Sequence, residues 1–134
     1  MAVDQHPLKE VTLKIRELGL CSAIPPIQDI DKTLHLPSES LENPLKLLRS
    51  VLEPTRFKIL YLLHQSPLPT CVIAYILKQD RTLISHHLTK LMELNLVEVK
   101  RVKRFNIYSL TERGTTIVGK VLELFKEITH PPEV

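Results

Sequence analysis

Apolar residues recur along this chain at helical intervals. In the first twenty residues, Leu8, Val11, Ile15 and Leu18 fall three or four positions apart with charged residues between them, which predicts a helix. The same spacing predicts further helices, namely one capped by Asn43, two over about 55–64 and 70–78, one capped by Asp80 and one over about 112–129. Helices therefore dominate the predicted fold.

The distribution of proline divides the chain into an arm and a main domain. Residues 20–40 contain several prolines among scattered Asp and Ser residues, a composition typical of a linker. We therefore expect an N-terminal arm over residues 1–40, made of a helix at about 7–19 and this linker. Residues 41–134 would form the main domain.

β-branched and aromatic residues dominate the stretch from Leu96 to Leu110, with a break near Val102 and Lys103. That composition predicts two antiparallel strands joined by a tight turn. The order of a helix, a short helix, a helix and a charged ribbon is that of a winged helix-turn-helix. The predicted fold class is therefore mostly α with a small β-hairpin wing (α+β).

The helix capped by Asp80 has two contrasting faces. Its apolar side should face the core and contains Leu83, Ile84, Leu88 and Leu91, with His87 among them. The opposite face carries Arg81, Thr82, Ser85, His86 and Thr89. Any soluble helix needs a polar face, but short polar side chains also let a helix approach the edges of DNA bases. Because a basic hairpin follows, we interpret this face as a DNA-reading surface.

Basic residues gather at the tip of the predicted hairpin, which carries Lys100, Arg101, Lys103 and Arg104. Cations placed there would contact DNA phosphates and gain affinity by releasing condensed counterions. Lys and Arg also protect exposed strand edges from aggregation, which is the alternative explanation. Four cations at one tip exceed that need, so phosphate binding is the favoured interpretation.

Composition and charge argue against several other classes of protein. The chain has 134 residues, of which 43% are hydrophobic and 25% charged, with a formal net charge of +3. No apolar run reaches the roughly 18 residues that a membrane-spanning helix needs, and the N-terminus lacks the apolar block of a signal peptide. We expect a cytoplasmic protein. With no glycine-rich phosphate loop and no nucleophile paired with a base, we expect neither an enzyme nor a cofactor.

Two motifs carry a resemblance to a known family. Residues 52–63 read L-E-P-T-R-F-K-I-L-Y-L-L, and residues 83–91 read L-I-S-H-H-L-T-K-L. They are similar to the signatures L-A-D-P-T-R-L-x-I-L-x-L-L and T-V-S-x-H-L-x-x-L of the ArsR/SmtB family of bacterial and archaeal repressors. A closing Y-S-L-T at residues 108–111 also matches. Residues 45–125 thus resemble a winged helix-turn-helix transcriptional regulator, although no glycine stands at the turn of the wing.

The resemblance implies a homodimer that is built on terminal helices and binds a pseudo-palindromic operator, as a repressor of the ArsR type. The two reading helices would then lie about one DNA turn apart. The apolar stripes of the first and last helices are too broad for one small domain to cover. We therefore expect a dimer interface that includes Leu8, Val11, Ile15, Val118, Leu122 and Phe125.

The effector of such a regulator stays open. ArsR/SmtB relatives often carry a Cys-x-Cys pair before the reading helix, and the aligned residues 69–71 retain one thiol, Cys71. The family's zinc-binding spacing in the last helix is also absent, where this chain has Glu123, Glu127 and His130. Neither metal motif is intact, and no metal ligands are assigned. Cys71 and Cys21 of the arm could form a redox-sensitive pair, hold a soft metal ion between two thiolates, or be incidental.

Two classes of function remain. The first is a sequence-specific regulator of transcription, whose partners are double-stranded DNA and a second copy of itself, with no membrane. The second is a winged-helix module that holds another protein or an RNA and has no operator specificity. The placement of polar and basic residues on the reading helix and the hairpin favours the first class.

Overall fold

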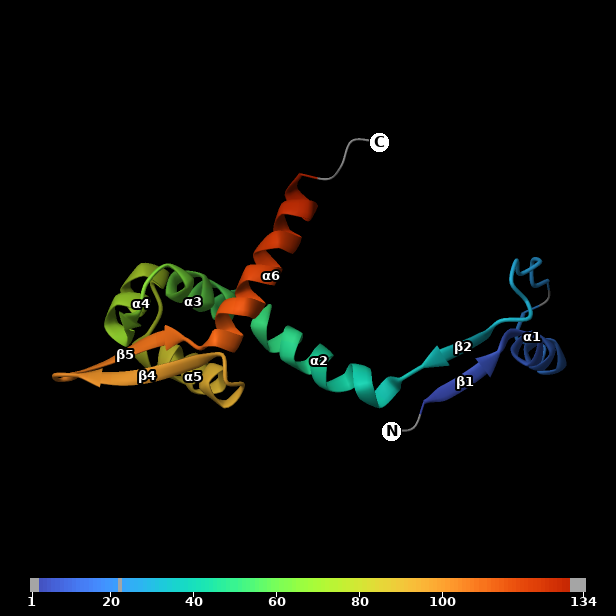
Figure 1. The fold of residues 1–134 in the computed structure, drawn as a ribbon, viewed down its shortest axis with the longest axis horizontal. Helices are drawn as coiled ribbons and strands as arrows, with labels where there is room; N and C mark the ends of the chain where they lie inside the picture. The colour runs from blue at the N-terminus through green and yellow to red at the C-terminus, as the bar shows by residue number, and fades with distance from the viewer. Residues whose placement is uncertain (1–2, 22, 131–134) are drawn as a thin grey trace. The chain divides into compact units, whose positions relative to one another are not determined.

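The chain folds into two units, over residues 1–46 and 47–134, which we call unit 1 and unit 2 (Figure 1). The computed structural model describes residues 3–21 and 23–130. The boundary between the units falls within helix α2 (Ser38–Val51).

Unit 1 contains a helix and a pair of strands. Strand β1 (Asp4–Pro7) leads directly into α1 (Leu8–Glu17), and β2 (Thr33–Leu36) pairs antiparallel with β1. Helix α1 occupies most of the range predicted to be helical. The linker predicted over residues 20–40 is shorter than expected, because β2 and the first residues of α2 lie in its second half. The strand pairing was missed because β1 has no alternating apolar pattern and pairs through its backbone.

Helix α2 begins six residues earlier than the sequence indicated. It starts at Ser38 rather than after Asn43, and Pro44 lies inside it. The amide of Leu41 donates to the carbonyl of Pro37 at 3.0 Å, which closes the first turn. Pro37 therefore stands just before the helix, where Asn43 was expected, and its carbonyl accepts the first hydrogen bond of the helix.

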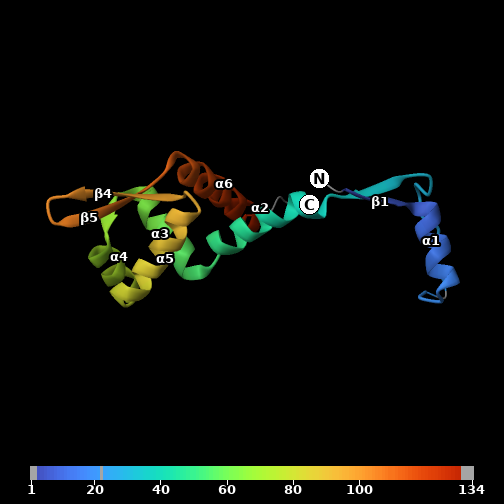
Figure 2. The same ribbon diagram turned by 90° about the horizontal axis from the view of Figure 1, so that it is seen from below.

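Unit 2 consists of helices α3 (Pro54–Gln65), α4 (Thr70–Leu77), α5 (Arg81–Glu93) and α6 (Glu112–Thr129), with the end of α2. Its antiparallel sheet has the strand order β3 (Leu68–Pro69), β5 (Phe105–Leu110), β4 (Val97–Val102). Strands β4 and β5 extend past the helices as a two-stranded ribbon (Figure 2). The α+β winged helix-turn-helix prediction is confirmed, and the short strand β3 was not predicted.

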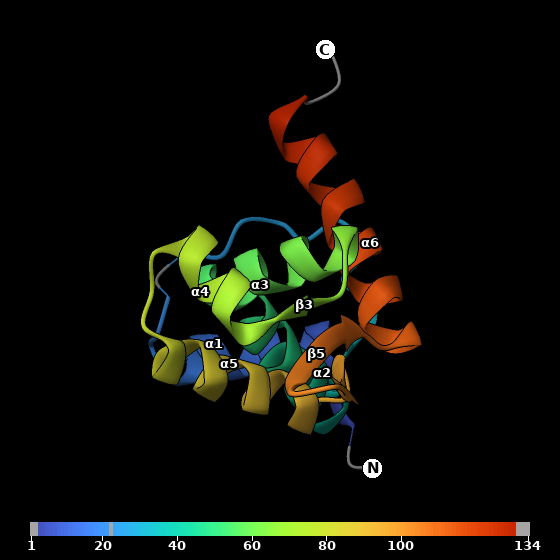
Figure 3. The same cartoon turned by 90° about the vertical axis from the view of Figure 1, so that its left-hand side faces the viewer.

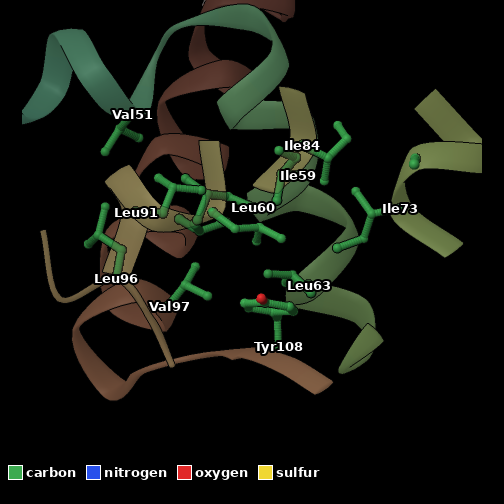
Figure 4. Close-up of a cluster of buried hydrophobic side chains, with 13 residues drawn as sticks. Val51, Ile59, Leu60, Leu63, Ile73, Ile84, Leu91, Leu96, Val97 and Tyr108 are labelled. Carbon is green, nitrogen blue, oxygen red and sulfur yellow. The ribbon is translucent and has the colours of Figure 1, made fainter. Parts of the chain in front are cut away.

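The core of unit 2 is apolar and joins all its helices to the sheet (Figure 4). Helix α3 lies against α4, α5, α6 and β5, so it buries more than one stripe. The apolar spacing over 55–64 predicts that Phe57, Leu60, Tyr61 and Leu63 face the core, yet Tyr61 is 46% exposed and Ile59 is fully buried. A periodic apolar pattern on one face does not identify the buried residues of a helix that has neighbours on several sides.

The start of α6 is fixed to the two residues that precede β4, Asn95 and Leu96. Thr111 caps the helix, because its hydroxyl accepts from the amide of Gly114 at 3.0 Å and donates to the carbonyl of Asn95 at 2.7 Å. The amide of Thr111 donates to the carbonyl of Leu96 at 3.0 Å. A Cβ added at Gly114 would overlap that same carbonyl oxygen, so glycine allows the close approach.

Candidate nucleic-acid interface

Helix α5 lies with one side in the core and the other in solvent. Ile84, Leu88 and Leu91 are fully buried. All five predicted reading residues are exposed on the other side: Arg81, Thr82, Ser85, His86 and Thr89. The helical period of 3.6 residues accounts for this separation, because residues three and four apart share a face. The structure thus brings the predicted set together on one accessible surface.

A tight turn sets the direction of α5 relative to α4, its neighbour in the helix-turn-helix (Figure 3). Lys78 adopts left-handed backbone angles, with φ of 55°, and the amide of Gln79 donates back to the carbonyl of Ala74 at 3.0 Å. Asp80 stands at the N-cap of α5 as predicted, but its carboxylate makes no capping hydrogen bond. The angle between the helices therefore depends on the backbone of Lys78 rather than on the side chain of Asp80.

The polar groups on α5 differ in what they can offer a base. The hydroxyl of Thr89 donates to the carbonyl of Ser85 at 2.9 Å, so it is left to accept rather than donate. Within the described parts of the chain, the side chains of Ser85 and His86 have no hydrogen-bond partner. Both therefore present free donors and acceptors for base edges.

Leu83 is a further candidate for the site, which the predicted reading set did not include. It was placed in the core, yet it is 40% exposed. It precedes His86 by three residues and so borders the polar face of α5. An apolar side chain at that border can contact the methyl group of a thymine. The signal was present in the sequence, since position 83 lies at the edge of the apolar stripe.

A polar cluster beneath α5 joins it to the start of α3. Arg56 Nε donates to His87 Nδ1 at 3.1 Å, and His87 Nδ1 lies 4.0 Å from Glu53 Oε2. Only 14% of the His87 side chain is exposed, so it packs under the helix as the sequence indicated. Burial raises the pKa of Glu53, but hydrogen bonds from the amides of Arg56 and Thr55 and the nearby charges of His87 and Arg56 lower it more, leaving it below its ordinary value.

The wing turns one residue later than the sequence indicated. Val102 pairs with Phe105, so the turn consists of Lys103 and Arg104. Lys103 has φ of 57°, the left-handed conformation that glycine adopts most easily. The missing glycine is therefore replaced by a lysine in the same backbone region. The four predicted phosphate-binding residues of the wing are all exposed: Lys100, Arg101, Lys103 and Arg104.

The strand register separates two of these cations. Lys100 lies opposite Ile107 and Arg101 opposite Asn106. Because cross-strand partners share a face and successive residues alternate, Lys100 and Arg101 lie on opposite faces of the ribbon. Arg101 shares its face with the buried Tyr108, so it is on the side of the ribbon that packs on the core.

The predicted thiol and dimer residues lie in different settings. Cys21 is exposed in unit 1, Cys71 is partly exposed in α4, and both are free thiols. Val118 is fully buried in the core of unit 2, which corrects its assignment to a dimer interface. The other five assigned residues keep exposed surface: Leu8, Val11, Ile15, Leu122 and Phe125.

No group of three or more His, Cys, Asp or Glu side chains in residues 3–21 and 23–130 could hold a metal ion together. None of the helices in those ranges is long and apolar enough to cross a membrane.

Comparison with protein families gives a match over the helix-turn-helix. Residues 53–99 match the sequence model of the family described as bacterial regulatory protein, arsR family. That range contains α3, α4, α5 and the start of β4. A comparison with curated protein sequences gives no significant match.

Solved structures share the same fold. The homodimeric winged helix-turn-helix DNA-binding domain of a possible ArsR-family transcriptional regulator from Mycobacterium bovis has a TM-score of 0.62 at 22% identity, over 72% of this chain and 93% of that one. NolR from Sinorhizobium fredii has a TM-score of 0.59 at 24% identity, over 78% and 96%. A possible transcriptional regulator for arsenical resistance has a TM-score of 0.50 at 26% identity, over 64% and 96%.

Proposed function

Residues 53–99 of this chain belong to the arsR family of bacterial regulatory proteins, and from that premise we propose that the protein is a sequence-specific DNA-binding regulator of transcription. It acts as a repressor in the cytoplasm, where a bacterial chromosome lies. As a homodimer it binds a pseudo-palindromic operator.

One observation carries the proposal of sequence reading: α5 has an exposed face of short polar side chains above a fully buried apolar face. The buried residues Ile84, Leu88 and Leu91 hold the helix rigidly in the core. Ser85 and His86 face solvent without protein partners among the described residues. A helix of this kind enters the major groove, and the unpaired groups hydrogen-bond to base edges.

Unpartnered apolar surface supports the homodimer. None of the described residues of unit 1 is buried, so this unit has no core of its own. A helix of ten residues and a two-stranded ribbon are marginal in water without such a core. The outer part of α6 also exposes Leu124 by 55%, Phe125 by 37% and Ile128 by 66%. A second copy would bury these surfaces, and one structural relative is itself homodimeric.

Assembly can be tested by sedimentation of the whole protein. We expect a dimer at micromolar concentration, and Leu124→Glu with Ile128→Glu should convert it to a monomer. Lys126→Glu is the matched control, because it introduces a glutamate on the opposite side of α6. A monomeric wild-type protein would contradict the proposed dimer and the paired half-sites together.

Two-fold symmetry predicts the form of the operator. Two α5 helices in one dimer would enter major grooves about 34 Å apart, one helical turn, so the two half-sites should be inverted repeats. A dimer bound over a promoter excludes the polymerase, which is the simplest route to repression.

The decisive experiment measures binding to a duplex from the protein's own promoter region and to a mixed-sequence duplex. We expect the promoter duplex to bind more tightly in excess competitor DNA. Ser85→Ala combined with His86→Ala should cost about 1–3 kcal/mol per lost base contact on the promoter duplex, and much less on the mixed one. His64→Ala, an exposed histidine of α3, is the control.

Equal affinity of the wild-type protein for both duplexes would contradict sequence-specific reading. That result would favour the other class, a winged-helix module that binds a protein or an RNA. If the double variant loses the same affinity for both duplexes, Ser85 and His86 do not read bases. The proposal that the protein binds DNA would be unaffected.

A further inference from the structure

A small hollow lies where the start of α4, the start of α5 and the turn of the wing meet. Its volume is about 220 Å³, and it is lined by Pro69, Thr70, Cys71, Arg81, Arg104 and Asn106, beside Phe105. Pockets that hold drug-sized molecules begin at roughly 300 Å³. The hollow therefore suits a small ligand group.

The lining of this hollow is positively charged. Arg81 comes from the first position of α5 and Arg104 from the wing, and no carboxylate lines the space. Across residues 3–21 and 23–130, neither arginine forms an ion pair. The nearest acid in sequence, Asp80, lines a separate hollow with Arg81. Two guanidinium groups held around one space repel each other, and an anion between them removes that repulsion.

The other groups in the hollow are suited to an oxyanion. Helix α4 begins here, and its N-cap, Pro69, provides no side-chain acceptor for the amides of the first turn. Those amides point out of the start of the helix, where the helix dipole favours negative charge. The side-chain amide of Asn106 adds a neutral donor at the wing. Donors from three elements thus surround one small space.

We propose that this hollow binds one phosphate group of the DNA backbone, held jointly by Arg81 and Arg104. The inference rests on the proposed function, because it names the group of the duplex that this site takes. It moves Arg81 from the base-reading set to the phosphate-binding set. The remaining polar residues of α5 read bases, while the shared phosphate fixes α5 and the wing to the same point of one strand.

Substitution of the two arginines tests the site in the whole protein. Arg81→Ala and Arg104→Ala should each weaken binding by about tenfold on both the promoter duplex and the mixed-sequence duplex. For each variant, the slope of the logarithm of the binding constant against the logarithm of the salt concentration should become shallower by about one unit. The double variant should lose less than the product of the single losses, because both side chains act on the same phosphate. Arg113→Ala, an exposed arginine of α6, is the matched control and should combine multiplicatively with Arg81→Ala.

Cys71 supplies an independent readout, since it is one of the residues that line the same hollow. In a Cys21→Ser background, the mixed-sequence duplex should slow alkylation of Cys71 by a maleimide. Millimolar inorganic phosphate alone should leave the rate unchanged, because a free ion lacks the rest of the DNA contact. Protection by inorganic phosphate would instead assign the hollow to a small anion and overturn the proposal.

The remaining outcomes separate this inference from the proposed function. Losses at Arg81 confined to the promoter duplex would make it a base reader and overturn the inference, with the function intact. Multiplicative losses for Arg81 and Arg104 would place them on separate phosphates, which also overturns it. The wild-type protein could also bind both duplexes equally well while the double arginine variant still loses less affinity than the product of the single losses. That result would support the phosphate site and contradict sequence-specific regulation.

Discussion

Arg56 donates a hydrogen bond from Nε to Nδ1 of His87 over 3.1 Å, joining two residues that lie 31 positions apart in the sequence. One belongs to the first turn of α3 and the other to the underside of α5. Both stand in the motifs that carry the family resemblance. The contact therefore positions the reading helix from below, on the side away from the proposed DNA.

Removing this hydrogen bond should destabilise the fold. His87→Ala leaves Arg56 without its acceptor in a partly buried place, which should lower the free energy of unfolding by about 1–3 kcal/mol. Arg56→Lys should behave similarly, because an ammonium group cannot reproduce the geometry of Nε. Urea unfolding measures both variants, with the exposed His64→Ala as control. If both variants are as stable as the control, the hydrogen bond does not stabilise the packing of α5.

The loss of stability of the fold at acidic pH should depend on Glu53. Partial burial raises the folded-state pKa of Glu53, but amide hydrogen bonds and positive charges lower it more. The folded-state pKa therefore lies below the ordinary value of 4.5. A depressed carboxylate pKa stabilises the fold above the unfolded-state pKa, and that stability is lost as pH falls through the folded-state pKa. Glu53→Gln should therefore flatten the decline below about pH 4.5. Glu93→Gln, in an exposed ion pair of α5, should leave the profile unchanged.

The sequence predicts the helix-turn-helix of unit 2 better than it predicts unit 1, for physical reasons. Periodicity defines α5 because the helix has one buried and one exposed face. It fails for Tyr61, since α3 has neighbours on several sides, and for Leu83, at the edge of a stripe. The pairing of β1 with β2 was invisible because it depends on backbone hydrogen bonds. The Arg56–His87 contact joins distant segments, and no local pattern contains it.

The turn of the wing combines a strained backbone with a cation. Lys103 adopts φ of 57°, which costs a residue with a Cβ about 1 kcal/mol. Lys103→Gly should relieve that strain and raise the free energy of unfolding by about that amount, whereas Lys103→Ala should not. Both variants lose the charge, so both should flatten the salt dependence of DNA binding by about one unit. Unchanged salt dependence in both would mean that Lys103 does not contact DNA.

The two glycines of α6 should respond to alanine in opposite directions. A Cβ at Gly114 would overlap the backbone carbonyl of Leu96, and a backbone group cannot move aside cheaply. Gly114→Ala should therefore destabilise the fold by about 1–3 kcal/mol. At Gly119 nothing lies within 4 Å of an added Cβ, so Gly119→Ala should stabilise the helix by about 0.5–1 kcal/mol. Thermal unfolding distinguishes them, and stabilisation by both would contradict the close approach at Leu96.

The two thiols lead to the last prediction. Arsenite binds tightly where two or three thiolates converge, and here Pro69 occupies the first position of the family's pair, with Cys71 as the single thiol beside it. Arsenite should therefore leave DNA binding unchanged. A bulky maleimide on Cys71 should weaken binding, because Cys71 lines the same hollow as Arg81 and Arg104. Alkylation of Cys71→Ser protein, in which only Cys21 can react, is the control and should have no effect. Strong inhibition by arsenite would instead place both thiols in one metal-binding site.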